Sequence, residues 1–106
     1  MTEERIDAVF SALSDPTRRS VMRLLSEGDA NATEIAGQLP VSRQAVTKHL
    51  SMLSDAGLVT SQRDGRENRY HLTPERFRDA MSWMADVGAG WDARLETLQR
   101  FLQTRS

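Results

Sequence analysis

The chain has 106 residues, a formal net charge of −1 and 39% hydrophobic residues, a composition that suits one folded domain with a single modest core. It contains no cysteine, which excludes disulfides, thiolate metal sites and cysteine nucleophiles. The acidic start MTEERID argues against a signal peptide, and no stretch approaches the roughly 18 apolar residues of a membrane helix, so we expect a cytoplasmic protein.

Positive charge is concentrated in the middle third of the chain. Residues 1–40 hold four basic and seven acidic residues, whereas residues 41–71 hold five basic and three acidic ones. Residues 72–106 are balanced, with five of each sign. A surface that binds a polyanion would therefore have to lie within residues 41–71.

Two helical patterns open the chain. Residues 3–13 carry apolar side chains at positions 6, 9, 10 and 13, which is the spacing of one helix face. The stretch SDPTRRSVMRLLSEG predicts a second helix, with Ser14 or Asp15 as N-cap and Pro16 in the first turn. Gly28 suits a left-handed residue at the exit of this helix.

A helix–turn–helix pattern follows. In the sequence NATE, Asn31 fits an N-cap, and Glu34 three residues later completes a capping box. Pro40 ends this third helix, and only one further residue precedes Ser42, which caps a fourth helix. Two short helices joined by so tight a turn must cross steeply.

The fourth helix carries two stripes. On a wheel of 100° per residue, Val46, Leu50 and Leu53 share one arc, which predicts the side that faces the core. The roughly opposite arc is polar and holds Gln44, Thr47, Lys48 and Ser51, with Arg43 on its flank. Their amide, hydroxyl, ammonium and guanidinium groups match base edges and phosphates in the DNA major groove. A solvated helix face is the alternative reading of such a stripe taken alone.

A β-hairpin is predicted after position 57. The dipeptide DG at 64–65, between β-compatible runs, is a strong hairpin signal, because a type I′ turn needs positive φ at both central residues. Pairing about this turn places Val59 opposite Tyr70 and Arg63 opposite Arg66. The valine and tyrosine would then anchor the hairpin on the domain, with arginines at its tip.

The last predicted helix spans residues 74–104. Its apolar positions recur in alternating steps of four and three residues: Phe77, Met81, Met84, Gly88, Trp91, Leu95, Leu98 and Leu102. At about 45 Å, this helix is longer than so small a domain can cover. The first half can pack within the subunit, and the rest needs a second chain. The expected dimer interface comprises Ile6, Phe10, Met84, Trp91, Leu95, Leu98 and Leu102. The sequence GAG at 88–90 has three possible meanings, which are a close crossing between helices, a kink, or a break into two helices.

Three linked motifs carry a family resemblance. The stretches LSDPTRRSVMRLL, ATEIAGQLPVSRQAVTKHLSMLSDAGLV and RDGRENRYHLT, within residues 6–73, resemble the ArsR/SmtB family of prokaryotic winged-helix repressors. The resemblance implies a homodimer that binds an inverted-repeat operator. By matching motifs, the resemblance implies DNA contacts at Ser42, Arg43, Gln44, Thr47, Lys48, Arg66 and Arg69. The polar stripe of the fourth helix adds Ser51 to the predicted contacts, and the hairpin adds Arg63.

The metal-sensing residues of many members of that family have no counterpart here. The third helix, NATEIAGQL, has no thiol, and the last helix has Asp79, Asp86 and Asp92 but no histidine. We therefore expect no metal site and no cofactor. The two histidines lie elsewhere, His71 in the hairpin and His49 between the two stripes of the fourth helix. For His49, packing beside Leu50 and donation to a DNA phosphate are both open.

These observations predict a mainly α, single winged helix-turn-helix domain over residues 1–106, with a two-stranded β-hairpin wing. Residues 1–13 and 74–104 form dimerisation helices, residues 31–57 the helix–turn–helix and residues 58–73 the wing. The predicted function is that of a homodimeric DNA-binding repressor whose recognition helix spans residues 42–56, with an unidentified small-molecule or protein effector as a further partner. The alternative is a winged-helix protein-interaction module without DNA binding. We do not expect an enzyme, because no nucleophile–base pair, phosphate loop or metal cluster is visible.

Overall fold

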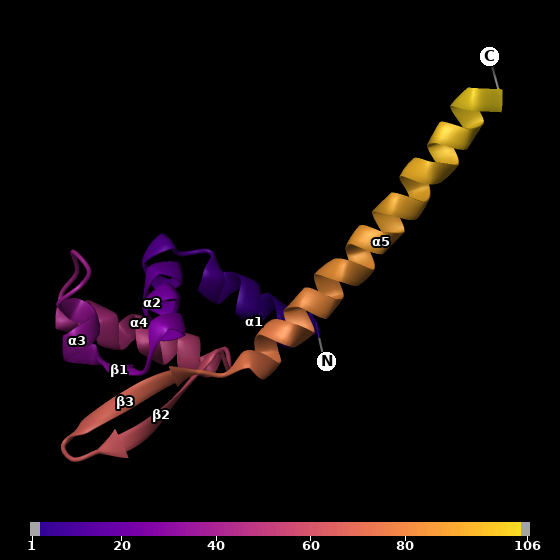
Figure 1. Cartoon of the computed structure of the whole chain (residues 1–106). Helices are drawn as coiled ribbons and strands as arrows, with labels where there is room; N and C mark the ends of the chain where they lie inside the picture. The colour runs from indigo at the N-terminus through magenta and orange to yellow at the C-terminus, as the bar shows by residue number, and fades with distance from the viewer. Residues whose placement is uncertain (1–2, 105–106) are drawn as a thin grey trace.

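The computed structural model describes residues 3–104, except for the side chains of residues 3, 91 and 104, and is mainly helical with one small sheet (Figure 1). The elements are α1 (Glu3–Leu13), α2 (Pro16–Glu27), β1 (Ala30–Asn31), α3 (Ala32–Ala36), α4 (Arg43–Asp55), β2 (Val59–Asp64), β3 (Glu67–Leu72) and α5 (Pro74–Thr104). The predicted order of helices and hairpin is confirmed. The strand β1 was not predicted.

A buried arginine fixes the corner between α1 and α2. The Asp15 side chain caps α2 by accepting hydrogen bonds from the amides of Thr17 and Arg18, at 2.8 and 3.1 Å. The guanidinium of Arg18 reaches back to the C-terminal end of α1, where its Nε donates to the carbonyl oxygen of Ala12 at 2.6 Å. Its Nη1 lies 3.2 Å from the sulfur of Met52 on α4. One side chain therefore connects α1, α2 and α4, and its positive charge suits the negative end of the α1 dipole.

Two predicted helix ends need correction. Gly28 has φ 162° and ψ 160°, which is extended backbone, so α2 does not leave through a left-handed residue. The third helix ends at Ala36 and does not continue to Pro40. The amide of Gly37 donates to the carbonyl oxygen of Thr33, and that of Gln38 to Ile35, so the chain tightens into a turn there. The connection from α3 to α4 therefore covers residues 37–42.

The sheet has the strand order β1-β3-β2, and both pairings are antiparallel. The predicted hairpin register is wrong by two residues, because Val59 lies opposite Leu72 instead of Tyr70, and Arg63 opposite Asn68 instead of Arg66. Positive φ among the turn residues is confined to Gly65, at 64°. Glycine at the first central position matches a type II′ turn, which spares Asp64 the left-handed conformation that a type I′ turn would have imposed.

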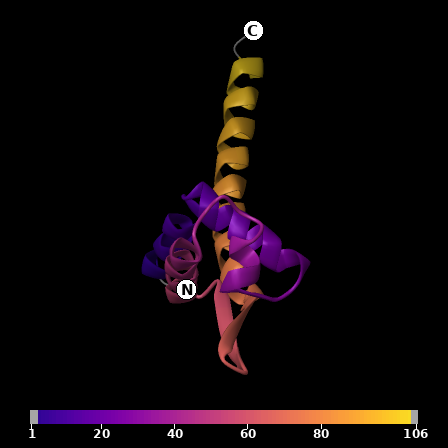
Figure 2. The ribbon, with the colours of Figure 1, turned by 90° about the vertical axis from the view of Figure 1, so that its left-hand side faces the viewer.

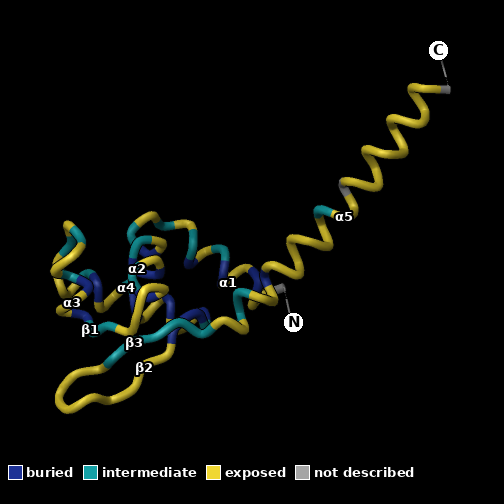
Figure 3. The backbone as a smooth tube through the Cα atoms, in the orientation of Figure 1, coloured by how far each residue is buried: buried dark blue, intermediate teal, exposed yellow. Residues whose placement is uncertain are grey.

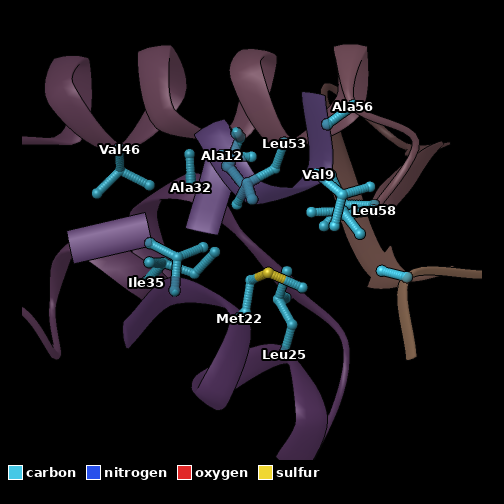
Figure 4. Close-up of a cluster of buried hydrophobic side chains, with 14 residues drawn as sticks. Val9, Ala12, Met22, Leu25, Ala32, Ile35, Val46, Leu53, Ala56 and Leu58 are labelled. Atoms are coloured by element: carbon cyan, nitrogen blue, oxygen red, sulfur yellow. The ribbon is translucent and has the colours of Figure 1, made fainter. Parts of the chain in front are cut away.

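The core lies where α2, α3 and α4 meet the root of the hairpin, and α1 closes one side of it (Figure 4). Its largest fully buried side chains are Val9, Val21, Ile35, Val46, Leu50, Leu53, Leu58 and Val59. Burial of each such side chain contributes about 1.5–3 kcal/mol. The predicted apolar stripe of the fourth helix accounts for three of these residues, so the orientation of α4 follows from its own sequence.

Helix α5 leaves the domain as one continuous element of 31 residues, and the glycines at 88 and 90 do not break it (Figures 1 and 2). The radius of gyration is 19.1 Å, compared with about 13 Å expected for a compact chain of this length. Figure 3 shows the helix exposed along nearly all of its length beyond the first turns. Much of α5 is therefore not covered within this chain.

The packing of α5 on its own subunit follows the predicted seam only in part, since Phe77 packs against the core cluster as expected. Ala80 is buried, and Trp83 packs edge-to-face on Phe10 with the ring centroids 5.7 Å apart. Met81, expected to pack inside the subunit, is 61% exposed. Ile6, which was expected in the dimer interface, is 6% exposed in the single chain and lines a hollow with Trp83 of α5.

Candidate nucleic-acid interface

The polar stripe of α4 is uncovered. Val46, Leu50 and Leu53 are fully buried on one side of the helix. The predicted contact residues of α4 are all exposed: Ser42, Arg43, Gln44, Thr47, Lys48 and Ser51. A helix with this division presents mixed hydrogen-bonding groups and positive charge to an approaching polyanion.

Two hydroxyls of this stripe also bond to α4 itself. Ser42 is the N-cap and accepts from the amide of Ala45 at 3.1 Å. The hydroxyl of Thr47 donates to the carbonyl oxygen of Arg43 at 3.0 Å. Its proton is therefore used within the helix, and its oxygen and methyl group are left for a partner. Gln44 and Lys48 form no side-chain hydrogen bond in the described part of the chain, so their polar groups are available.

The three wing arginines have different surroundings. Arg69 is held at the base of the wing, where Nη1 lies 3.2 Å from Oε1 of Glu34 and Nη2 donates to the carbonyl oxygen of Asp29 at 3.0 Å. Its guanidinium therefore already supports the fold, unlike the free wing cation that the sequence suggested. Arg63 donates through Nε to the carbonyl oxygen of Gly65 at 3.1 Å, within the hairpin. Arg66 lies in the turn and is exposed.

A cleft of about 140 Å³ joins the recognition helix to the wing. It is lined by Asn31, Ala32, Arg43, Thr47, Arg66, Glu67, Asn68 and Tyr70. Arg43 of α4 and Arg66 of the turn, distant in sequence, therefore share one hollow. Asn68 and Tyr70 were not among the predicted site residues, although their i, i+2 spacing on a strand places them on one face.

His49 lies half-buried between the stripes, and its Nδ1 is buried without a hydrogen-bond partner among the described residues. It stands near the N-cap of α2. The pKa of Asp15 is lowered from its ordinary value of 3.8, first by the hydrogen bond from the Arg18 amide, and further by the Thr17 amide and the charges of Arg18 and His49, while burial opposes the shift. The location favours packing of His49 against the domain over an exposed phosphate contact.

Two other kinds of site are absent from the described part of the chain. Within residues 3–104, no three histidine, cysteine, aspartate or glutamate side chains lie close enough together to hold a metal ion. Over the same range, no helix combines the length and apolar character needed to cross a membrane.

Comparison with known proteins gives consistent results. A family model described as a helix-turn-helix domain matches residues 13–62. The chain is 37% identical over 76 residues to the transcriptional repressor SdpR of Bacillus subtilis, covering 72% of this chain and 84% of that protein. It is 32% identical over 91 residues to a probable mercury resistance operon repressor of Streptomyces lividans, covering 86% of this chain and 73% of that one.

Solved structures agree with the sequence matches. An ArsR-like transcriptional regulator from Rhodococcus sp. RHA1 superposes with a TM-score of 0.84 at 38% identity, covering 93% of both chains. The homodimeric winged helix-turn-helix DNA-binding domain Mb0332 of Mycobacterium bovis superposes with a TM-score of 0.64 at 25% identity, covering 88% of this chain and 83% of that one.

Proposed function

This chain belongs to the ArsR family of winged helix-turn-helix transcriptional regulators, and we propose that it is a homodimeric repressor that binds an inverted-repeat operator. The chain is a DNA-binding regulator and not an enzyme. The observation that carries the proposal is the uncovered polar stripe of α4 opposite its buried apolar stripe, beside a wing with an exposed arginine at its turn. In such folds, the recognition helix enters the major groove and the wing reaches the neighbouring backbone or minor groove.

The proposed DNA contacts divide by chemistry. Gln44 is suited to bidentate recognition of an adenine edge, and Lys48 to a phosphate. Arg43, Thr47 and Ser51 extend the same surface of α4. On the wing, Arg66 is the proposed contact, while Arg63 and Arg69 act from positions where each also bonds within the protein.

The proposed dimer forms through the apolar face of α5. Met84, Leu95, Leu98 and Leu102 are each about half exposed in this chain, as are Val87 and Phe101. Phe10 is half-buried against Trp83 of α5, and the side chain of Trp91 lies outside the described residues. So long an exposed apolar face is the kind of surface that a second subunit covers. An effector, either a small molecule or a protein, that changes this interface would change the spacing of the two recognition helices.

The dimer gives the recognition helices their operator geometry. Two copies of α4 separated by roughly 34 Å enter successive major grooves on one face of DNA, so a two-fold protein matches a two-fold site. Repression then follows from occupancy of that site. We place this activity in the cytoplasm.

Selection of bound fragments from sheared genomic DNA tests the proposal. We expect enrichment of one inverted-repeat sequence and an affinity that falls steeply with salt, because several phosphate contacts release counterions. A protein that binds no duplex DNA at any salt concentration would instead be an interaction module on the same scaffold.

A further inference from the structure

The cleft between α4 and the wing combines groups that suit one small anion. Arg43 contributes from the first turn of α4, Arg66 from the hairpin turn, and Asn68 and Tyr70 from β3. The hairpin turn lies at the same end of the domain as α3, so the wing folds back toward the start of the recognition helix (Figure 1). At about 140 Å³ the cleft is smaller than the roughly 300–1,000 Å³ typical of small-molecule sites.

The four polar side chains that converge here lack partners. In residues 3–104, the guanidinium groups of Arg43 and Arg66, the amide of Asn68 and the hydroxyl of Tyr70 make no hydrogen bond or ion pair. Arg69 differs from these side chains, because its guanidinium bonds to both Glu34 and a backbone carbonyl. The cleft therefore holds hydrogen-bond donors that the fold itself does not use.

One carboxylate also lines the cleft and has to be considered. Glu67 accepts a hydrogen bond from the side-chain amide of Asn31 through Oε2, so this oxygen is already bound. Two guanidinium groups exceed its single negative charge, and the first turn of α4 adds the positive end of a helix dipole. The local balance favours an anion over a cation.

We infer that one backbone phosphate of the operator is seated in this cleft and is held jointly by Arg43 and Arg66, with Asn68 and Tyr70 as additional donors. Guanidinium groups pair with phosphate oxygens in a planar, two-bond geometry, and amide and hydroxyl donors commonly complete such contacts. The shared phosphate would fix the wing against α4 when DNA is bound. The inference rests on the proposed function, since it names the ligand group at that same surface.

Neutral methylphosphonate linkages, placed one at a time along the selected operator, test the inference. For the parent protein, we expect one position in each half-site to weaken binding by about 10-fold or more, in line with loss of charge-assisted hydrogen bonds. Arg43→Ala and Arg66→Ala should each bind the unmodified operator more weakly and lose most of their sensitivity at that same position. Arg78→Ala, which removes an exposed arginine of α5, should keep the parent pattern.

The possible outcomes separate the hypotheses. Loss of sensitivity at two different positions would show that the arginines bind separate phosphates and would overturn the shared site, leaving the proposed function intact. Failure of the parent to bind duplex DNA would overturn both. Inorganic phosphate provides the last comparison: we expect it to compete with the operator no better than chloride at equal ionic strength. Saturable phosphate binding by the parent that Arg43→Ala abolishes would make a free anion the ligand and overturn the DNA assignment.

Discussion

Arg69 and Glu34 form an ion pair at the base of the wing, with Nη1 of the arginine 3.2 Å from Oε1 of the glutamate. The same Oε1 accepts the amide of Asn31 at 3.0 Å, and the amide of Glu34 donates to Oδ1 of Asn31 at 2.8 Å, which completes the capping box of α3. One carboxylate therefore both starts α3 and holds β3. This carboxylate links the wing to the helix–turn–helix.

Glu34→Gln separates these two roles. The amide oxygen can still accept from Asn31, but the charge that holds Arg69 is lost. Because the two side chains are 41% and 48% exposed, we expect a change of less than about 1 kcal/mol in unfolding free energy. Operator affinity should fall several-fold if the ion pair orients the wing. Glu34→Ala keeps the bond from the backbone amide of residue 34 to Oδ1 of Asn31 but removes the acceptor of the Asn31 backbone amide, so it should lower the unfolding free energy by about 1 kcal/mol more. Unchanged affinity in Glu34→Gln would show that the wing is oriented without this pair.

Gln44→Ala and Lys48→Ala should change DNA binding in different ways, because a base edge differs between sequences and a phosphate does not. Lys48→Ala should weaken binding to all duplexes and lower the slope of log affinity against log salt by about one. Gln44→Ala should leave the slope unchanged and lose about 1–3 kcal/mol of discrimination at one base pair. Titrations of operator and single-base variants at several salt concentrations measure both. Parent-like behaviour in both variants would place the DNA surface elsewhere.

Leu98→Glu should dissociate the dimer. Leu98 is 53% exposed on the apolar face of α5, and a carboxylate there would have to be buried without a partner in the interface. Sedimentation equilibrium should then give the mass of one chain, with loss of tight operator binding. Arg100→Glu changes charge on the opposite side of the helix and should remain dimeric. A parent protein with the mass of a single chain would contradict the proposed dimer directly.

Gly57→Ala should destabilise the fold at the exit of α4. Gly57 has φ +78°, and a Cβ built there would lie 2.8 Å from Nε and 2.9 Å from Cγ of Arg76. The left-handed conformation alone costs a residue with a side chain about 1–2 kcal/mol. Gly90→Ala is the matched control, because a Cβ there meets nothing within 4 Å and alanine favours the helix by about 1 kcal/mol. Chemical denaturation should therefore shift in opposite directions for the two variants.

The Asp15 cap predicts a dependence of stability on pH. Since the pKa of Asp15 is lowered in the folded chain, its ionised form stabilises the fold above the ordinary value of 3.8. This contribution is lost as pH falls through the lowered pKa. Asp15→Asn keeps an acceptor at the cap but removes the charge, so it should be less stable than the parent near neutral pH. The difference in melting temperature should shrink below pH 3.8; a constant difference would contradict the assignment.

Features set by local chemistry could be predicted from the sequence. The caps at Asp15, Asn31 and Ser42 follow from side chains that accept nearby amides, and the structure has all three. The two stripes of α4 were predictable because seven of its residues fall into two opposite arcs of the helical period. A hairpin near Gly65 was also indicated, but not its register, since glycine fits more than one position of a tight turn.

Features set by tertiary contacts could not be predicted from the sequence. The strand β1 has only two residues, which is too short for any alternation to appear. Ala80 carries little hydrophobic signal, yet it is the buried contact of α5 because a small side chain allows close approach. The sequence predicts Arg69 as a DNA contact and gives no sign that Arg18 is buried, because only the fold supplies the carbonyl oxygens that bind both side chains. Asn68 could not be predicted as a site residue for the same reason, because it joins the candidate site only where the wing meets α4.

The unbroken α5 gives this small protein a lever arm. A rod about 45 Å long that swings by about 10° around its far end displaces its near end by about 8 Å. That displacement is comparable to the width of the major groove, about 12 Å, into which α4 must fit. A modest rearrangement near the C-terminal end of α5 would therefore move each α4 out of register with its half-site, without any change inside the globular part of the molecule.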